Sequence, residues 1–125
     1  NPALEKKYLK ELLTPTRIYC SLINNLISRF TIKGLAHITG GGLIGNIPRI
    51  IPKGLKFELF PCNWPVPEVF LKLQEAGKIS DNEMLRVFNM GIGLAVVVAE
   101  KETDAILKYL KKNKEKSYLI GEIKK

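Results

Sequence analysis

The sequence turns on the segment Ala36-His-Ile-Thr-Gly-Gly-Gly-Leu-Ile-Gly-Asn-Ile-Pro-Arg49, in which three consecutive glycines follow a short apolar run. Glycine adopts positive φ readily and lets another group approach the main chain closely. A strand that runs into glycines and then into a helix presents free N–H groups, which suit a phosphate or a carboxylate. We therefore interpret this segment first as an anion site.

The composition is that of one ordinary globular domain of 125 residues, with 46% hydrophobic and 26% charged residues. The longest apolar run, Ile92–Ala99, is far shorter than the ~20 residues that a membrane span needs. Cys20 and Cys62 form neither a disulfide framework nor a metal-binding motif, so a reducing cytoplasm is the simplest location. We expect no membrane and no metal site in this chain.

The net charge of +8 comes largely from the end of the chain, where residues 101–125 carry eight lysines against four acids, or +4. Basic surfaces can recruit nucleic acid. These lysines fall on the polar side of one expected helix and its tail, without interleaved arginines and aromatics. A solvated face is therefore favoured over a nucleic-acid groove.

Hydrophobic spacing and turn residues predict helices and strands that alternate along the chain. The expected strand at 35–39 has Leu35, His37 and Thr39 on one face, with the two intervening apolar residues on the other. The apolar run from Ile92 predicts a central strand covered on both faces. The other expected strands are 56–60 and 118–123; helices are expected at 3–13, 18–30, 43–47 (stopping before Pro48), 66–77, from a Ser80 cap to 88, and from a Thr103 or Asp104 cap to 110. This alternation indicates a mixed α/β layer structure.

Polar residues gather on both sides of the glycine triplet. His37 and Thr39 precede it, while Asn46 and Arg49 follow it, and arginine can hold a phosphate through two hydrogen bonds. The spacing fits neither a P-loop nor a dinucleotide fingerprint. We favour a ligand site over a plain turn, with the single histidine donating to an anion or carrying a proton.

Two further segments leave alternatives open. In Asn89-Met-Gly-Ile-Gly93 the polar residue and both glycines share strand parity, which fits either close helix packing or backbone access for a substrate. Pro15-Thr-Arg-Ile-Tyr19 joins two expected helices and places Thr16 and Arg17 at a helix start, where a cap and a surface arginine are the plain interpretation. Trp64 is expected to anchor a loop.

Taken together, these blocks resemble the phosphoribosylformylglycinamidine cyclo-ligase family, also called aminoimidazole ribonucleotide synthetase. The resemblance runs in order over nearly the whole chain but covers only the C-terminal domain of that family. It implies a single domain over 1–125, the C-terminal half of an enzyme, with a three-layer α/β/α fold and a mixed, partly ferredoxin-like sheet. The matching segments are Leu12–Tyr19, Ala36–Gly42, Asn46–Arg49, Trp64–Phe70, Leu73 and Gln74 with Gly77, and Glu83–Gly93.

The resemblance also implies a function: ATP-dependent ring closure of formylglycinamidine ribonucleotide to aminoimidazole ribonucleotide, ADP and phosphate. ATP and Mg²⁺ would be bound mainly by an N-terminal domain that this chain lacks, and the full-length enzyme would be a homodimer. His37 is the candidate catalytic residue. The candidate substrate and phosphate-binding residues are Thr39, Gly40, Gly41, Gly42, Asn46, Arg49, Thr16, Arg17, Asn89 and Gly91.

One position departs from the family pattern, since Gly45 stands where a glutamate usually precedes Asn-Ile-Pro-Arg. A glutamate there would be able to hydrogen-bond or to contact the partner domain, so no role is assigned to this position. Two other functions compete with the cyclo-ligase: a basic nucleic-acid-binding module, and a stand-alone domain that binds a nucleotide metabolite.

Overall fold

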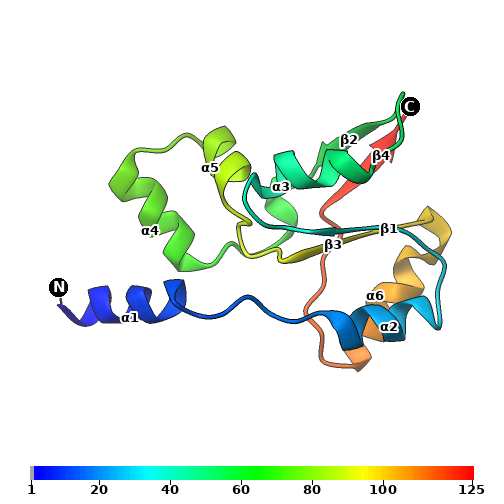
Figure 1. Cartoon of the computed structure of the whole chain (residues 1–125), viewed down its shortest axis with the longest axis horizontal. Coiled ribbons are helices and arrows are strands. Elements are labelled where there is room, and N and C mark those ends of the chain that lie inside the picture. Colours follow the sequence, from blue (N-terminus) through cyan, green and yellow to red (C-terminus); the bar gives the residue numbers. More distant parts are fainter. Residues whose placement is uncertain (1) are drawn as a thin grey trace.

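The computed structural model describes residues 2–125, and its helices and strands interleave along the chain (Figure 1). The α/β class predicted from the sequence is confirmed. The helices are α1 (Pro2–Leu12), α2 (Cys20–Ile27), α3 (Gly42–Asn46), α4 (Glu68–Gly77), α5 (Asp81–Val87) and α6 (Thr103–Lys112). The strands are β1 (Ile32–His37), β2 (Lys56–Leu59), β3 (Leu94–Val98) and β4 (Gly121–Lys124), and short 3-10 turns cover Ile47–Ile50, Pro61–Asn63 and Glu100–Glu102.

The strands form two separate antiparallel pairs. β1 pairs with β3, with His37 opposite Leu94, and the N–H of Ile38 extends this ladder by donating to the Gly93 carbonyl at 2.9 Å. β2 pairs with β4, with Phe57 opposite Ile123. The mixed sheet that the family resemblance implied is therefore wrong for the described residues, whose strands form two antiparallel pairs. Hydrophobic periodicity predicts which side chains share a face, but it does not say which strands become neighbours.

The β1–β3 pair is covered on both faces. Leu26 of α2 and Ile106 of α6 pack on one face with Val96, while Ala36 and Ala95 belong to the core on the other face. Figure 1 shows α2 and α6 on one side of this pair, and α3 with the β2–β4 pair on the other. The prediction of a strand covered on both faces is confirmed for β3, but β3 is hydrogen-bonded to β1 alone among the described strands and is not central.

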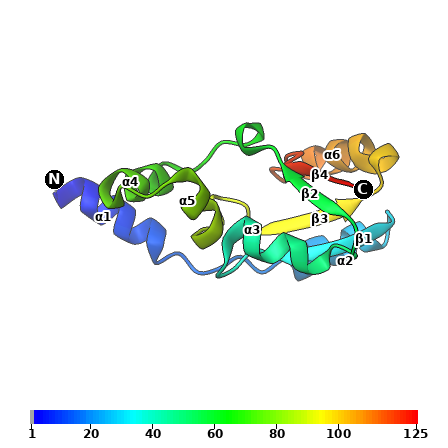
Figure 2. The same cartoon turned by 90° about the horizontal axis from the view of Figure 1, so that it is seen from above.

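Helices α1, α4 and α5 gather at one end of the molecule, away from α2 and α6 (Figure 2). α5 begins as predicted, because the hydroxyl of Ser80 accepts a hydrogen bond from the Glu83 N–H at 3.3 Å. The predicted cap of α6 is wrong. Thr103 is already the first helical residue, because a 3-10 turn leads directly into the helix and the Thr103 hydroxyl bonds back to Ala99.

The helix after the glycines also continues further than predicted. α3 ends at Asn46, but the chain coils on through a 3-10 turn that contains Pro48 in its first positions. Proline is tolerated there because the N–H that it lacks has no partner inside the first turn of a helix. This continuation brings Arg49 back toward the glycines.

Candidate functional site

The glycine loop, residues 39–42, connects the end of β1 to α3. Gly41 and Gly42 have φ of +99° and +58°, a left-handed conformation that favours glycine. The N–H of Gly42 donates to the Thr39 carbonyl at 3.1 Å, and the N–H of Gly45 donates to the Gly41 carbonyl at 2.8 Å. The sequence predicted that the loop presents free N–H groups to an anion. This is wrong for Gly42, because its N–H is already hydrogen-bonded inside the loop.

The glycines of the loop serve two different purposes. A Cβ on Gly42 would overlap the Leu85 carbonyl oxygen and lie 2.7 Å from that of Phe88, so this buried glycine lets α3 pack against the end of α5. A Cβ on Gly40 would meet no atom within 4 Å among the described residues. Gly40 and Gly41 are exposed, and they form the open part of the loop.

Asn46 braces the loop from beneath. Its side chain is buried, and Nδ2 donates to the carbonyl oxygens of Thr39 at 3.2 Å, Gly40 at 3.2 Å and Gly42 at 2.8 Å. The sequence placed Asn46 among the ligand-binding residues. The structure instead turns its amide nitrogen inward, because one turn of α3 carries the side chain back under its own N-terminus.

Three polar side chains remain on the outer side. His37 and Thr39 are exposed while Ala36 and Ile38 are buried, so the predicted strand parity is confirmed. A terminal guanidinium nitrogen of Arg49 would lie 3.9 Å from a Cβ on Gly41, which places this exposed cation beside the open glycines. The ion pairs of the described residues involve other cations and leave Arg49 unpaired.

Thr16 and Arg17 do not lie at a helix start, because α2 begins only at Cys20 and both residues precede it in an irregular segment. Arg17 is not a free charge either. Its guanidinium donates to both carboxylate oxygens of Glu115, at 2.9 and 2.5 Å. These hydrogen bonds lower the pKa of Glu115 and raise that of Arg17. Glu115 lies 98 residues from Arg17 in the sequence, so no local pattern predicts this ion pair.

The segment Asn89–Gly93 forms a tight turn before β3, so the predicted strand parity of Asn89, Gly91 and Gly93 is wrong. Met90 and Gly91 have positive φ, and the Asn89 side-chain oxygen accepts from the Gly91 N–H at 2.9 Å. A Cβ on Gly91 would lie 2.6 Å from Pro67 Cδ. Of the two interpretations left open by the sequence, these contacts favour close packing over substrate access.

Trp64 fixes the same turn from the core. Its side chain is buried, and its indole Nε1 donates to the Met90 carbonyl at 3.0 Å. The predicted role of Trp64 as a loop anchor is confirmed. Asn89 is half-buried and Gly91 stays exposed, but both make their contacts within this turn and with Pro67.

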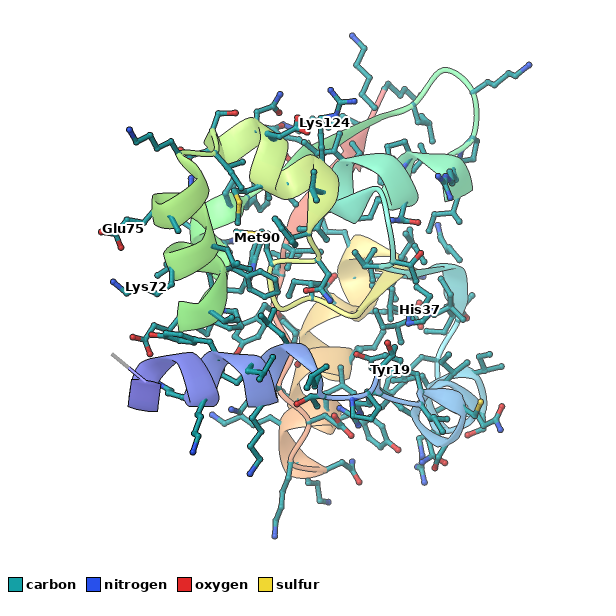
Figure 3. The ribbon with its side chains drawn as sticks, turned by 60° about the vertical axis from the view of Figure 1, so that its left-hand side comes forward. Tyr19, His37, Lys72, Glu75, Met90 and Lys124 are labelled. Carbon is teal, nitrogen blue, oxygen red and sulfur yellow. The ribbon has the colours of Figure 1, made fainter. Side chains whose placement is uncertain are left out.

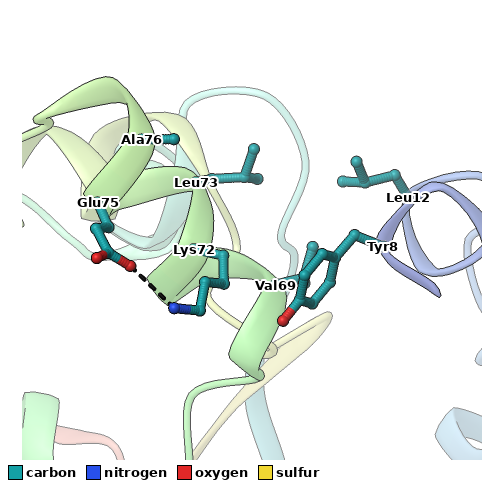
Figure 4. Close-up of a pocket in the computed structure, with 7 residues that line it drawn as sticks. All are labelled: Tyr8, Leu12, Val69, Lys72, Leu73, Glu75 and Ala76. Atoms are coloured by element: carbon teal, nitrogen blue, oxygen red, sulfur yellow. Dashed lines mark hydrogen bonds and ion pairs between the residues drawn. The ribbon is translucent and has the colours of Figure 1, made fainter. Parts of the chain in front are cut away.

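Two grooves lie elsewhere on the described surface. One, of about 510 Å³, separates α1 from α4, and Figure 4 shows Tyr8 and Leu12 facing Val69 and Leu73 across it. Lys7 and Tyr8 tie the two helices together through Glu68, at 2.8 and 2.9 Å. Sequence analysis did not predict this groove. The i, i+4 spacing of the apolar residues on both helices is the pattern that could have indicated it.

The second groove, of about 660 Å³, lies beside α3 and β2 and includes Ile44, Phe57 and Leu85 in its walls. Neither groove is lined by His37, Thr39, the open glycines or Arg49. The residues of the candidate site thus belong to neither groove, and His37, Thr39, Gly40, Gly41 and Arg49 are all exposed. The described residues also contain no group of three or more His, Cys, Asp or Glu side chains suited to a metal ion.

Fold and loop together define an α/β domain that exposes a glycine loop and an unpaired arginine on one face. Residues 3–125 match the family described as AIR synthase related protein, C-terminal domain. The chain belongs to this family.

Curated relatives carry a more specific name. The chain is 50% identical over 124 residues to the phosphoribosylformylglycinamidine cyclo-ligase of Citrifermentans bemidjiense, and 52% identical over 124 residues to that of Geotalea daltonii; each alignment covers 99% of this chain and 36% of the relative. It is 46% identical to the enzyme of that name from Geobacillus thermodenitrificans, over 91% of this chain and 33% of the relative. The chain thus spans about a third of the length of these relatives. No helix among residues 2–125 has the length and apolar character to cross a membrane.

Proposed function

We propose that this chain forms the C-terminal half of the active site of a phosphoribosylformylglycinamidine cyclo-ligase in cytoplasmic purine biosynthesis. The family match and the cyclo-ligase names of the relatives support this proposal. The enzyme would close the imidazole ring of formylglycinamidine ribonucleotide at the expense of ATP. A homodimer of the longer protein is part of the same proposal.

The reaction requires two bond changes at one carbon. ATP phosphorylates the formyl-amide oxygen, which becomes a leaving group. The amidine nitrogen then attacks the same carbon, so that a C–N bond forms, the C–O bond breaks and phosphate departs. The attacking nitrogen also loses a proton, and the exposed imidazole of His37 at the end of β1 would accept it.

The observation that carries the proposal is the position of Arg49 beside the open glycines. Its guanidinium is exposed, lies next to Gly41 and is unpaired among the described side chains, so it would bind the ribose 5′-phosphate of the substrate. The hydroxyl of Thr39 and the N–H groups of Gly40 and Gly41 would add hydrogen bonds. α3 has only five residues, so the cation contributes more than the helix dipole.

Mg²⁺ is a different matter, because the described residues do not fit it. It binds through carboxylates and phosphates, and the side chains described for residues 6–125 include no group of three or more His, Cys, Asp or Glu that could hold it. We therefore assign Mg²⁺ and the triphosphate of ATP to the additional region that the longer relatives possess. This chain alone should show no ATP hydrolysis that depends on formylglycinamidine ribonucleotide, and such hydrolysis would contradict the proposal.

The phosphate role can be tested directly by NMR titration of the ¹⁵N-labelled chain with inorganic phosphate and with ribose 5-phosphate. We expect the amide signals of Gly40 and Gly41 to shift, and Arg49→Ala to abolish most of that response. Arg29→Ala, which removes an exposed arginine that stacks on Tyr109, is the matched control and should leave it unchanged. Equal responses in both variants would refute a phosphate site at the glycine loop.

A further inference from the structure

Tyr19 links the irregular segment before α2 to the candidate catalytic residue. Its ring meets the imidazole of His37 nearly edge-on, with centroids 6.0 Å apart and planes inclined by 67°. Figure 3 shows the two labelled side chains beside one another, one ahead of α2 and the other at the end of β1. Edge-to-face geometry of this kind is favourable between aromatic rings and restricts both of them.

The Tyr19 ring also contacts a charged group. The guanidinium carbon of Arg17 lies 5.2 Å from the ring centroid, and the same guanidinium is bound by both oxygens of Glu115. Glu115 follows α6, so this contact ties the irregular segment to the far end of the chain. The sequence suggested Arg17 as a phosphate-binding residue. In the structure its guanidinium instead contacts Tyr19 and Glu115.

The hydroxyl end of Tyr19 lies on Gly93. A Cβ at position 93 would overlap the Tyr19 hydroxyl oxygen and lie 3.0 Å from Cζ. Gly93 has an ordinary backbone conformation, outside the positive φ range, so the backbone alone does not require glycine here. The missing side chain leaves room for the tyrosine ring.

We propose that Tyr19 is a positioning residue for His37, held by the Glu115–Arg17 pair and by its contact with Gly93. The proposal rests on the proposed function and extends it: besides accepting a proton, the imidazole of His37 would donate a hydrogen bond to the substrate's phosphate. An exposed imidazole at a strand end samples several rotamers, and ordering it on binding costs affinity. A ring that orders it in advance should improve ligand binding roughly two- to tenfold.

The chain has a single histidine, so its imidazole signals can be followed in the NMR spectrum without ambiguity. In Tyr19→Leu we expect the His37 ring signals to lose the ring-current shift caused by the tyrosine, and binding of ribose 5-phosphate to weaken by the same two- to tenfold. Tyr19→Phe keeps the ring and should keep both properties. Arg29→Ala, which breaks the other arginine–tyrosine stack at 5.3 Å, is the control and should change neither.

Gly93→Ala tests the same contact from the opposite side. Its new methyl group should displace Tyr19 and reproduce the His37 spectrum of Tyr19→Leu. Adding Tyr19→Phe removes the overlapping hydroxyl and should restore part of the native spectrum. A variant with a global change in its ¹⁵N spectrum is misfolded, and the comparison then rests on Tyr19→Phe and on Arg17→Ala, which should broaden the His37 signals.

The outcomes separate the two proposals. Native His37 signals in both Tyr19→Leu and Gly93→Ala would overturn the positioning role of Tyr19. A native chain that binds no phosphate, while its His37 signals still depend on Tyr19, would refute the proposed phosphate site and leave the positioning contact standing. Tyr19-dependent His37 signals together with weakened ribose 5-phosphate binding would support both.

Discussion

The molecule has two glycine-rich bends, the glycine loop at 39–42 and the turn at 89–93, and each is braced by an asparagine. In the first, Asn46 donates one amide group to three carbonyl oxygens from below, which leaves Gly40 and Gly41 exposed. In the second, Asn89 accepts from the Gly91 N–H, and a Cβ on either glycine would collide with a neighbour, Pro67 at Gly91 and Tyr19 at Gly93. In the proposed function the first bend offers its backbone to a phosphate, while the second uses its lack of side chains for packing.

The contrast shows that a glycine in a polar segment can have either of two roles, to expose the backbone or to allow close packing. Gly42 belongs by sequence to the open loop, yet it packs against carbonyl oxygens of α5 as tightly as Gly93 packs against Tyr19. What differs from one glycine to another is whether a neighbouring segment occupies the space that a side chain would need. Substitutions can therefore test each glycine for the role that the structure gives it.

The largest expected effect is that of Gly42→Ala. The added methyl group would overlap backbone carbonyls that cannot move without shifting α5, and φ of +58° is costly for alanine. We expect a loss of about 2–5 kcal/mol in the free energy of unfolding, measured by urea denaturation. Gly40→Ala, which meets open space, should change it by no more than about 0.5 kcal/mol. Equal losses of stability in the two variants would show that Gly42 is packed no more tightly than Gly40.

The two asparagines provide the next comparison. Asn46→Ala removes a donor from three loop carbonyls, of which that of Thr39 keeps the Gly42 N–H, and we expect a loss of about 1–3 kcal/mol together with weaker phosphate binding. Asn89→Ala removes one hydrogen bond at a half-buried site, so about 0.5–1.5 kcal/mol is expected, with no change in phosphate binding. Urea denaturation and phosphate titration of both variants check this difference. Loss of phosphate binding in Asn89→Ala would place the second turn in the ligand site.

A smaller effect is expected for Glu115→Gln, which weakens the ion pair that holds Tyr19 over the second turn. Arg17 is about half exposed, so solvent screens the pair and the loss should be about 0.2–1 kcal/mol. The pKa of Glu115 is lowered in the folded state, so its contribution is present above the unfolded pKa and fades as pH falls through the folded one. The stability difference between native chain and variant should therefore shrink on acidification. A difference that grows in acid would contradict the assigned pair.

The smallest effect is expected far from both bends. Replacing Lys108, Lys111 and Lys112 of α6 by glutamine removes exposed charges and should alter stability by about 0.5 kcal/mol or less, with phosphate binding unchanged. The same variant tests the nucleic-acid alternative. Salt-sensitive binding of an oligonucleotide that disappears with these lysines would support that alternative instead.

Much of the local structure follows from the sequence. The parity of His37 and Thr39 against Ala36 and Ile38, the Ser80 cap and the turn at the glycine triplet were all predicted, because each depends on residues within a few positions of one another. The family resemblance also came from short blocks in their order along the chain. Such features are local, and side-chain spacing or backbone stereochemistry is enough to define them.

The tertiary structure decided the rest. Glu115 meets Arg17, Tyr19 meets His37 and α5 meets Gly42 only in the folded chain. The sequence pattern of one segment in each of these contacts contains no information about the other segment. The same holds for the strand pairing, where two antiparallel pairs replaced the expected mixed sheet. Contacts between distant segments depend on which surfaces bury each other, and that choice is made by the packing of the whole chain rather than by any one motif.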